Sequence, residues 1–391
     1  MHIVLTVNVA WNILNFRTPL VRALIADGHR VTILAPFDDT IDELRDLGCE
    51  CVDLPMDRKG LNPIGGVVLY RRMLRAFREL APDVVFGFTI KNNIFGAMAA
   101  RRLGLPFIPN VTGLGTAFLG SGLLLAVTKT LYRSAFTGLK EVFFQNADDR
   151  DLFVQNGLVR PWQATLLPGS GIDLDSYPAL PYLAPDPPMV FLMIARLLRD
   201  KGVREYAEAA RQLARAGLVC RLVGAIDEHN RTAISKTELE GWQQSGAIDY
   251  VGPVSDVRPY IENAHCVVLP SYREGAPRTL IEAAACARPL IATDVPGCRD
   301  VVEDGRNGFL CEVRSANALA SAMERFCDLD HIAKTEMAAA SRKLAAERYD
   351  VRHVIEAYRA AIARQGRNKG NLCRVQGKHQ HGGAGKAGSK S

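Results

Sequence analysis

The stretch Ser271-Tyr-Arg-Glu-Gly-Ala-Pro-Arg-Thr-Leu-Ile-Glu282 decides the fold of the second half of the chain. The apolar run before it, residues 265–270, predicts a buried parallel strand, and residues 277–287 have the composition of a helix. Gly275 permits a close backbone approach in the turn between them, and the proline suits the first turn of a helix. Strand, tight turn and helix in this order form the repeating unit of a doubly wound parallel sheet.

Two carboxylates, Glu274 and Glu282, stand eight positions apart across this turn. The free N–H groups and the positive dipole end of the helix favour an anion, such as a diphosphate, above the strand. Glu274 in the loop can accept hydrogen bonds from one polyol, and Glu282, further into the helix, from a second polyol such as a ribose. On spacing alone, a solvated loop residue and a charge on a helix face are the commoner explanation, because helices are rich in glutamate.

The longer pattern resembles the C-terminal domain of the family 4 retaining glycosyltransferases of the GT-B fold. It continues from the quoted stretch into Arg288-Pro-Leu-Ile-Ala-Thr-Asp-Val-Pro-Gly-Cys-Arg-Asp300. The resemblance covers residues 1–360 and is most specific from 190 to 312. It implies an α/β chain of two doubly wound, Rossmann-like domains that face a central cleft.

A second motif, Arg196-Leu-Leu-Arg-Asp-Lys-Gly202, ends an apolar run with two cations ahead of a predicted helix. Arginine bridges two phosphate oxygens and lysine supplies a compact charge, so Arg196 and Lys201 can clamp a diphosphate and stabilise a departing nucleotide. On this motif alone, a pair of solvated loop cations is an equal alternative. In the family that the chain resembles, the matching arginine and lysine contact the donor diphosphate.

The resemblance also implies roles for the other residues of the donor site. Glu282 matches the residue that binds the ribose, and Glu274 matches the residue that contacts the transferred sugar. We therefore expect Glu274, Arg196 and Lys201 to be catalytic. We expect the donor to be bound by Glu282 and by the turn and first helical residues, namely Gly275, Ala276, Pro277, Thr279 and Leu280.

The pattern of elements predicts two domains, because 391 residues are too many for one ordinary core. Apolar runs at 3–7, 30–34, 51–54, 83–88, 107–111 and 141–144 predict strands, with helical periodicity at 18–26, 67–80 and 95–103. A second series of strands is predicted at 189–195, 219–223, 249–251, 266–270, 290–293 and 309–311. We expect an acceptor domain at 1–170, a proline-dense linker at 171–188, a nucleotide-sugar domain at 189–350, and a disordered basic tail at 365–391. The resemblance implies that a helix at 351–364 returns to the first domain.

The acceptor side is predicted where strands of the first domain end. Candidates for acceptor or phosphate contact are Asn15, Lys91, Thr112, Gly113 and Gly115. The loop at residues 8–17 lacks the glycine pair of many family members, and no histidine occurs between His29 and His229. A histidine base is therefore not expected. The resemblance implies front-face substitution, in which the leaving phosphate oxygen takes the proton of the acceptor. The alternative is a covalent glycosyl-enzyme, which would need a carboxylate nucleophile and two carboxyl groups roughly 5–5.5 Å apart.

No metal and no cofactor are expected besides the UDP-sugar, which is a co-substrate. Asp173-Leu-Asp175 and Asp328-Leu-Asp330 fit the Asp-x-Asp string of metal-dependent glycosyltransferases. Neither string ends a strand beside the predicted nucleotide, so we expect these residues to cap turns and helices. Two cations are already placed for the phosphates.

Composition predicts a cytoplasmic protein on the inner face of the cell membrane. The longest apolar stretch, 117–127, is shorter than the roughly 20 residues of a membrane-spanning helix, and the N-terminus lacks the features of a signal peptide. The nine cysteines are expected to be reduced. The apolar segment 118–127 and a basic stretch can dock on anionic lipid, although a solvated helix face and a core helix explain them equally well. The basic stretch comprises Arg58, Lys59, Arg71, Arg72, Arg75 and Arg78.

The finer wording of several motifs resembles bacterial family members that add a hexosamine, such as N-acetylgalactosamine, to an undecaprenyl-diphosphate sugar. These motifs include residues 91–96, 112–115 and 270–278. The expected function is transfer of an N-acetylhexosamine from a UDP-sugar to a lipid-linked saccharide in the assembly of a surface glycan or glycoprotein glycan. A UDP-sugar 2-epimerase of related fold and a non-catalytic adaptor that uses the basic tail are the alternatives. Seven lysines and arginines lie in the tail from Arg364 onward, but without interleaved aromatics no specific nucleic-acid binding is expected.

Overall fold

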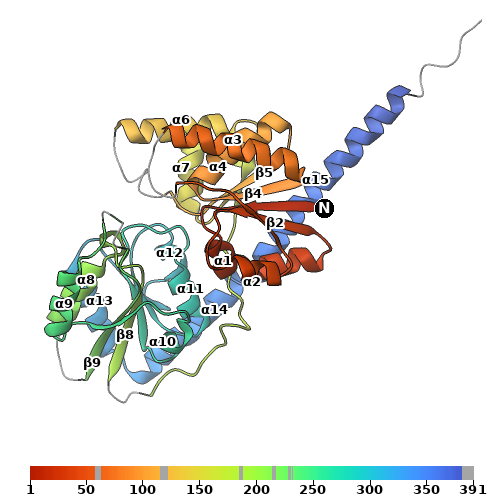
Figure 1. The fold of residues 1–391 in the computed structure, drawn as a ribbon. Coiled ribbons are helices and arrows are strands. Elements are labelled where there is room, and N and C mark those ends of the chain that lie inside the picture. Colours follow the sequence, from red (N-terminus) through yellow and green to blue (C-terminus); the bar gives the residue numbers. More distant parts are fainter. Residues whose placement is uncertain are drawn as a thin grey trace, which may run out of the picture. The chain divides into compact units, whose positions relative to one another are not determined.

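The computed structural model describes residues 1–57, 63–114, 122–184, 188–213, 217–227, 230 and 232–380 (Figure 1). The chain divides into two compact units, each of which is described by itself. The first unit comprises Met1–Asn110, Ser134–Val142 and the chain from Ile355 onward. The second comprises Val111–Arg133 and Phe143–Val354.

The first half of the chain forms a seven-stranded sheet of order β3-β2-β1-β4-β5-β6-β7. Strand β1 lies between β2 and β4 and pairs in parallel with both. The strands are β1 (His2–Thr6), β2 (Arg30–Ala35), β3 (Glu50–Asp53), β4 (Val84–Phe88), β5 (Phe107–Val111), β6 (Val142–Phe144) and β7 (Ala164–Leu166). The helices are α1 (Trp11–Ala26), α2 (Ile41–Asp46), α3 (Pro63–Leu80), α4 (Ile90–Leu103), α6 (Leu123–Phe136) and α7 (Ala147–Gln155).

The second half of the chain forms a parallel six-stranded sheet of order β10-β9-β8-β11-β12-β13. Its strands are β8 (Met189–Ile194), β9 (Leu218–Val223), β10 (Asp249–Gly252), β11 (Cys266–Leu269), β12 (Leu290–Thr293) and β13 (Gly308–Cys311). Its helices are α8 (Val203–Gln212), α9 (Lys236–Gln244), α10 (Arg258–Glu262), α11 (Arg278–Ala285), α12 (Cys298–Val301), α13 (Ala316–Asp328) and α14 (His331–Arg348). A last helix, α15, runs over Val351–Gln380.

Helices cover both faces of the second sheet, so its strands are apolar on both sides. In β8, Phe191 and Met193 belong to one buried cluster, while Leu192 between them belongs to another. This alternation follows from the twofold period of side chains along a strand. Figure 1 shows α8, α9 and α13 on one side of β8 and β9, and α10, α11 and α14 on the other. These findings confirm the predicted fold class of parallel, doubly wound sheets.

Helix α1 begins at Trp11, so the loop predicted at residues 8–17 is wrong over most of its length. Pro19 favoured a start at residue 18, but Ile13 and Arg17 lie on the same buried face as Leu20 and Leu24. The apolar period therefore extends the helix through the proline.

Other helices also begin earlier or end later than predicted. Helix α4 starts at Ile90 rather than 95, and α3 starts at Pro63 rather than 67. Helix α15 continues to Gln380, beyond the helix expected at 351–364, and the disorder of the basic tail stays a prediction. The remaining tail, 381–391, lies outside the described residues.

The strand β7 was not predicted, because three residues carry too little periodicity to be recognised. By hydrogen bonding, β7 belongs to the first sheet, which is consistent with a first domain at 1–170. By compactness, however, residues 143–170 belong to the second unit. The exact domain limits therefore stay predictions. Across the described residues, no helix is both long and apolar enough to cross a membrane.

Candidate functional site

The order of the second sheet reverses between its neighbours β8 and β11. In open parallel sheets, ligands bind outside the carboxyl ends of the strands at such a reversal. The loops that leave these two strands carry Arg196 and Lys201 after β8, and Glu274 and Gly275 after β11. The topology therefore brings the two predicted motifs to one place, although they are more than 70 residues apart in sequence.

Glycines fix the two loops against each other. Gly202 has a φ of +74°, and a Cβ atom there would lie 2.1 Å from the carbonyl oxygen of Pro270. The backbone N–H of Tyr272 donates to the carbonyl of Asp200 at 2.9 Å, which joins the loops directly. A side chain at position 202 would force them apart.

The loop that carries Glu274 also rests on the turn after β12. The backbone N–H of Glu274 donates to the carbonyl of Pro296 at 3.2 Å. A Cβ atom on Gly297 would lie 2.7 Å from the carbonyl oxygen of Glu274, so only glycine allows this approach. Cys298 follows directly, and burial, with the nearby Glu274 as a second cause, raises the pKa of its thiol well above the usual value. The thiol therefore stays protonated and is not a nucleophile.

Lys201 and Glu274 form an ion pair, with 2.5 Å between Nζ and Oε1. The side chains are 25% and 12% exposed, so both are shielded but reachable from solvent. A charge-assisted hydrogen bond in such a partly dry place is stronger than one on the surface. The ion pair was not predicted, because the sequence analysis assigned both residues to contacts with the ligand and neither to a contact with the other.

Arg196 is 63% exposed, and its Nη1 lies 3.7 Å from Oδ2 of Asp227. An exposed pair at this distance contributes little to stability. The guanidinium thus lies on the loop after β8, and most of its N–H groups are open to solvent. This position is compatible with the predicted contact to a diphosphate.

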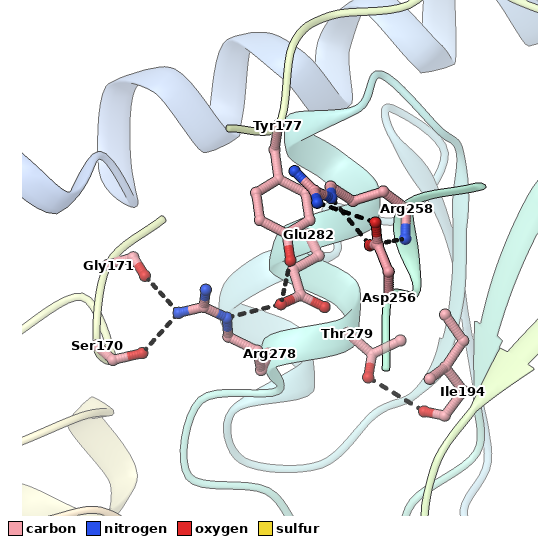
Figure 2. Close-up of polar contacts among 9 residues, drawn as sticks. All are labelled: Ser170, Gly171, Tyr177, Ile194, Asp256, Arg258, Arg278, Thr279 and Glu282. Atoms are coloured by element: carbon pink, nitrogen blue, oxygen red, sulfur yellow. Dashed lines mark hydrogen bonds and ion pairs between the residues drawn. The ribbon is translucent and has the colours of Figure 1, made fainter. Parts of the chain in front are cut away.

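Glu282 lies in α11 and is 8% exposed. Its Oε1 accepts hydrogen bonds from Nε of Arg278 at 2.8 Å and from the hydroxyl of Tyr177 at 3.0 Å (Figure 2). For the other oxygen, Oε2, the described part of the chain supplies no hydrogen-bond donor. One side of the carboxylate is held, and the other is left to accept a hydroxyl group.

Sequence reasoning missed both residues that hold Glu282. Arg278 was quoted within the deciding stretch, four positions before Glu282, and the spacing itself was the available signal. Tyr177 lies about a hundred residues earlier and carried no signal. Burial, and then the charge of Glu282, raise the pKa of Tyr177 far above its ordinary range, so its hydroxyl stays protonated and acts as a donor.

The start of α11 offers backbone donors. Pro277 is the N-cap residue rather than the first helical residue, and the helix begins at Arg278. Within the described ranges, no acceptor is found for the backbone N–H groups of Gly275, Ala276, Thr279 and Leu280. These free donors, at the positive end of the helix, can bind an anion.

Two predicted donor contacts are restricted by packing. The Leu280 side chain is fully buried in the core under the sheet, so its side chain cannot contact a ligand and only its backbone N–H can. The Thr279 hydroxyl donates to the carbonyl of Ile194 at 3.1 Å (Figure 2), which ties α11 to the end of β8. Both side chains thus position the helix.

Of the candidates on the acceptor side, Thr112 and Gly113 lie against the donor loop, since a Cβ atom on Gly275 would lie 2.2 Å from the carbonyl oxygen of Thr112. Lys91 lies in the first turn of α4 and donates from Nζ to the carbonyl of Asp57 at 2.6 Å. Asn15 is exposed in α1, and Thr112 and Gly113 follow β5. Among described residues, no hydrogen bond joins Asn15, Lys91 and Thr112, and Gly115 lies outside these residues.

Buried polar groups lie at the reversal point of the first sheet, between β1 and β4. Asn92 is fully buried and donates to the hydroxyl of Thr6 at 2.9 Å. Arg17 is buried, with its guanidinium carbon 4.0 Å from the centre of the Phe88 ring. Thr89 has a φ of +68°, which is rare for a β-branched residue and typical of functional loops. None of these was predicted.

One aspartate of each Asp-x-Asp string has the predicted role, Asp173 in a turn and Asp330 as a helix cap. Asp173 accepts hydrogen bonds from the backbone of Asp175 at 3.1 Å and from the hydroxyl of Ser176 at 2.7 Å. Asp330 caps α14 by accepting from the backbone of Ala333 at 2.7 Å. A search of the described residues finds no group of three or more histidines, cysteines or carboxylates placed to hold a metal.

Two family models match the chain. A glycosyl transferase 4-like domain matches residues 17–169, and glycosyl transferases group 1 matches residues 188–328. The matches cover the second sheet and all strands of the first except β1, and they include Arg196, Lys201, Glu274 and Glu282.

Curated relatives support the same assignment. The chain is 29% identical over 326 residues to the N,N'-diacetylbacillosaminyl-diphospho-undecaprenol alpha-1,3-N-acetylgalactosaminyltransferase of Campylobacter jejuni, covering 79% of this chain and 85% of that protein. It is 23% identical over 292 residues to the UDP-Gal:alpha-D-GlcNAc-diphosphoundecaprenol alpha-1,3-galactosyltransferase of Escherichia coli, covering 72% and 73% of the two chains.

Solved structures support the fold. A glycosyltransferase from Rickettsia africae has a TM-score of 0.75 at 19% identity, covering 94% of this chain and 99% of that chain. HepE from Anabaena, solved in complex with UDP-glucose, has a TM-score of 0.74 at 18% identity, with coverage of 93% and 99%. The chain is a glycosyltransferase of the GT-B fold and belongs to the family of group 1 and 4-like glycosyl transferases.

Proposed function

We propose that the protein transfers an N-acetylhexosamine from a UDP-sugar to a lipid-linked saccharide during assembly of a surface glycan or glycoprotein glycan. One observation carries the donor part of this proposal. At the β8/β11 reversal, two cations, free helix N–H groups and two carboxylates are carried by the loops after β8 and β11 and by the start of α11. Cations and helix amides suit the diphosphate, and carboxylates suit the hydroxyl groups on either side of it.

Each group then has one partner in the donor. Oε2 of Glu282 accepts from the ribose hydroxyls, because Oε1 is already held. Arg196, Lys201 and the amides of Gly275 and Ala276 bind the diphosphate. Glu274 contacts the transferred sugar, where its carboxylate accepts hydrogen bonds from hydroxyl groups.

Relatives support the choice of sugar and acceptor. The Campylobacter protein is named as an N-acetylgalactosaminyltransferase that acts on a diphospho-undecaprenol-linked sugar, and the Escherichia coli protein as a UDP-Gal-dependent enzyme with a diphosphoundecaprenol-linked acceptor. The alignment with the first spans most of both chains. We therefore assign a UDP-activated amino sugar as donor and an undecaprenyl-diphosphate-type saccharide as acceptor.

The reaction is proposed to retain the configuration at the sugar carbon and to need no metal. The bond from the anomeric carbon to the β-phosphate oxygen breaks, and a bond to the acceptor oxygen forms on the same face. The departing phosphate oxygen takes the acceptor proton. Arg196, Lys201 and the amides at the start of α11 stabilise the negative charge that develops on this phosphate.

We also propose that the protein binds peripherally at the inner face of the cell membrane. Helix α3 exposes Ile64, Val67 and Val68 near its start and the arginines at 71, 72, 75 and 78 beyond. An apolar patch followed by cations suits the boundary of an anionic bilayer. Arg58, Lys59 and residues 118–121, which the sequence also suggested for docking, lie outside the described residues.

Vesicle sedimentation tests this docking. We expect the protein to bind vesicles that contain anionic lipid and to bind neutral vesicles more weakly. The double variant Val67→Glu, Arg71→Glu should lose this binding. Equal binding of the double variant and the unchanged protein would remove α3 from the proposal. Glu79→Gln, on the same helix, is the matched control.

Incubation with radiolabelled UDP-N-acetylhexosamines and lipid-linked saccharides tests the activity. Label should enter the lipid fraction without added metal and in the presence of EDTA. Consumption of donor without acceptor would favour the epimerase, and nucleotide-independent partner binding would favour the adaptor. Full activity in Glu282→Ala and Arg196→Ala would overturn the site assignment.

A further inference from the structure

The side chain of Arg278 connects Glu282 to a turn in a distant part of the sequence. Its Nε donates to Oε1 of Glu282 at 2.8 Å, while its Nη1 donates to the hydroxyl of Ser170 at 3.0 Å and to the carbonyl of Gly171 at 2.9 Å (Figure 2). The arginine side chain is 22% exposed and that of Glu282 10%, so the bridge lies largely out of water. A planar guanidinium held at both ends fixes the direction of the carboxylate.

Local helix energetics do not explain this pair. Arg278 is the first residue of α11, where the positive end of the helix dipole disfavours a cation. An arginine placed four residues before a glutamate is also the less favourable order for such a pair in a helix. The pair therefore forms against the local preference of the helix. Its benefit is that it holds the carboxylate of Glu282 in place.

The turn that anchors Arg278 is itself tightly fixed. Gly171 has a φ of +73°, and a Cβ atom there would lie 2.6 Å from Cα of Val351. The backbone of Ile172 donates to the carbonyl of Tyr349 at 2.7 Å and accepts from the N–H of Val351 at 2.9 Å. Two segments of chain are thus clamped together, and their position determines where the guanidinium lies.

Tyr177 holds the same carboxylate oxygen from another direction. Its hydroxyl donates to Oε1 of Glu282 at 3.0 Å, and its backbone carbonyl accepts from Nη1 of Arg342 at 2.7 Å. With Oε1 fixed by two donors, rotation of the carboxylate is restricted and Oε2 keeps one direction.

We infer that Arg278 is a positioning residue that aims Oε2 of Glu282 at the ribose hydroxyls of the donor. The inference rests on the proposed ribose contact of Glu282. It adds that recognition of the hydroxyls depends on the anchor at Ser170 and Gly171, which does not touch the ligand. Arg278 acts through Glu282 and has no contact with the reacting atoms.

Calorimetric titration with UDP and with 2′,3′-dideoxy-UDP, which lacks both ribose hydroxyls, measures this directly. The unchanged protein should bind UDP about tenfold more tightly than dideoxy-UDP, as expected for hydrogen bonds to a charged group. In Arg278→Ala this ratio should fall to about two, while the affinity for dideoxy-UDP changes little. Arg278→Lys, which has one ammonium group in place of a fork, should give an intermediate ratio.

Controls separate positioning from charge and from folding. Arg258→Ala removes a nearby cation that pairs with Asp256 at 2.9 Å, and it should leave the ratio unchanged. Made alone, Ser170→Ala should lower the ratio of the two affinities about twofold. Added to Arg278→Ala, it should have no further effect, because both substitutions break the same chain of contacts to Glu282. Tyr177→Phe tests the same carboxylate if Arg278→Ala does not fold.

The outcomes are distinguishable. A normal ratio in Arg278→Ala, or an equal loss in Arg258→Ala, would overturn the inference and leave the proposed function standing. A ratio of one in the unchanged protein would remove the ribose role of Glu282 and the inference with it. Absence of any UDP binding would overturn the proposed function itself.

Discussion

The two sheets reverse their strand order in the same way, between β1 and β4 in one and between β8 and β11 in the other, but the residues at the two reversals differ. At β1/β4 the buried polar groups are neutral or packed on an aromatic ring, as with Asn92 and Arg17, and Lys91 donates to the carbonyl of Asp57. At β8/β11 the charged side chains of Arg196 and Lys201 reach solvent. The topology is the same at both reversals, so we expect the loop residues to decide which one binds an anion.

The largest expected effect comes from the glycines that shape the two halves. Gly202→Ala should lower the free energy of unfolding by about 3 kcal/mol, because φ is positive and the new Cβ meets the Pro270 carbonyl. Gly104→Ala, at the end of α4, also has a positive φ but has no atom within 4 Å of the new Cβ, so the loss should be about 1 kcal/mol. Urea unfolding measures both, and equal losses would contradict the close packing of the β8 and β11 loops.

The next effect concerns the lysines at the two reversals. Lys201→Ala should weaken UDP binding by about 10-fold to 100-fold, because a charge-assisted contact to the diphosphate is lost. Lys91→Ala should leave UDP affinity unchanged and alter only the KM of the acceptor. Equal effects of the two substitutions on UDP affinity would remove the functional contrast between the halves.

A smaller effect is expected from pH, through one buried histidine in each half. Burial lowers the pKa of His2 in β1, with the charge of Arg30 as second cause, and burial also lowers that of His265 just before β11. Both histidines take up a proton more readily in the unfolded chain than in the folded protein. The stabilisation that comes from keeping them neutral is therefore complete above about pH 6.5, and it is lost as pH falls through the folded-state pKa values. Thermal unfolding between pH 7.5 and 5.5 should show the decline. Ring signals that titrate at or above 6.5 would contradict it.

The smallest effect on stability is expected at Arg196. Arg196→Ala should leave the melting temperature nearly unchanged, since the pair with Asp227 is exposed and long. The same substitution should still weaken UDP binding. Arg75→Ala, in the exposed pair with Glu79 on α3, is the control from the first half and should affect neither property.

Most of the fold was predictable from the chain, because buried parallel strands are continuous apolar runs. The strands from β8 to β13 were predicted to within one or two residues. Helix starts were harder. Pro19 and the polar residues 91–93 resemble helix boundaries, but burial of one face extends α1 and α4 past them.

The candidate site was predictable where its signal lay in one stretch. Glu274, Glu282 and the start of α11 followed from the quoted residues, and the topology brought Arg196 and Lys201 beside them. Tyr177 was not predictable, since its contact with Glu282 depends on the path of the linker. The pairing of Lys201 with Glu274 also depends on two loops meeting in space.

That pairing has a consequence for selectivity. A carboxylate tethered 2.5 Å from Lys201 acts as a built-in competitor at a high effective concentration. Any anion that reaches the lysine must displace it, so a single phosphate in solution gains little. A ligand that supplies two phosphates and also hydroxyl groups for the displaced carboxylate would exchange one partner for several, so the ion pair would favour such a ligand over a single small anion.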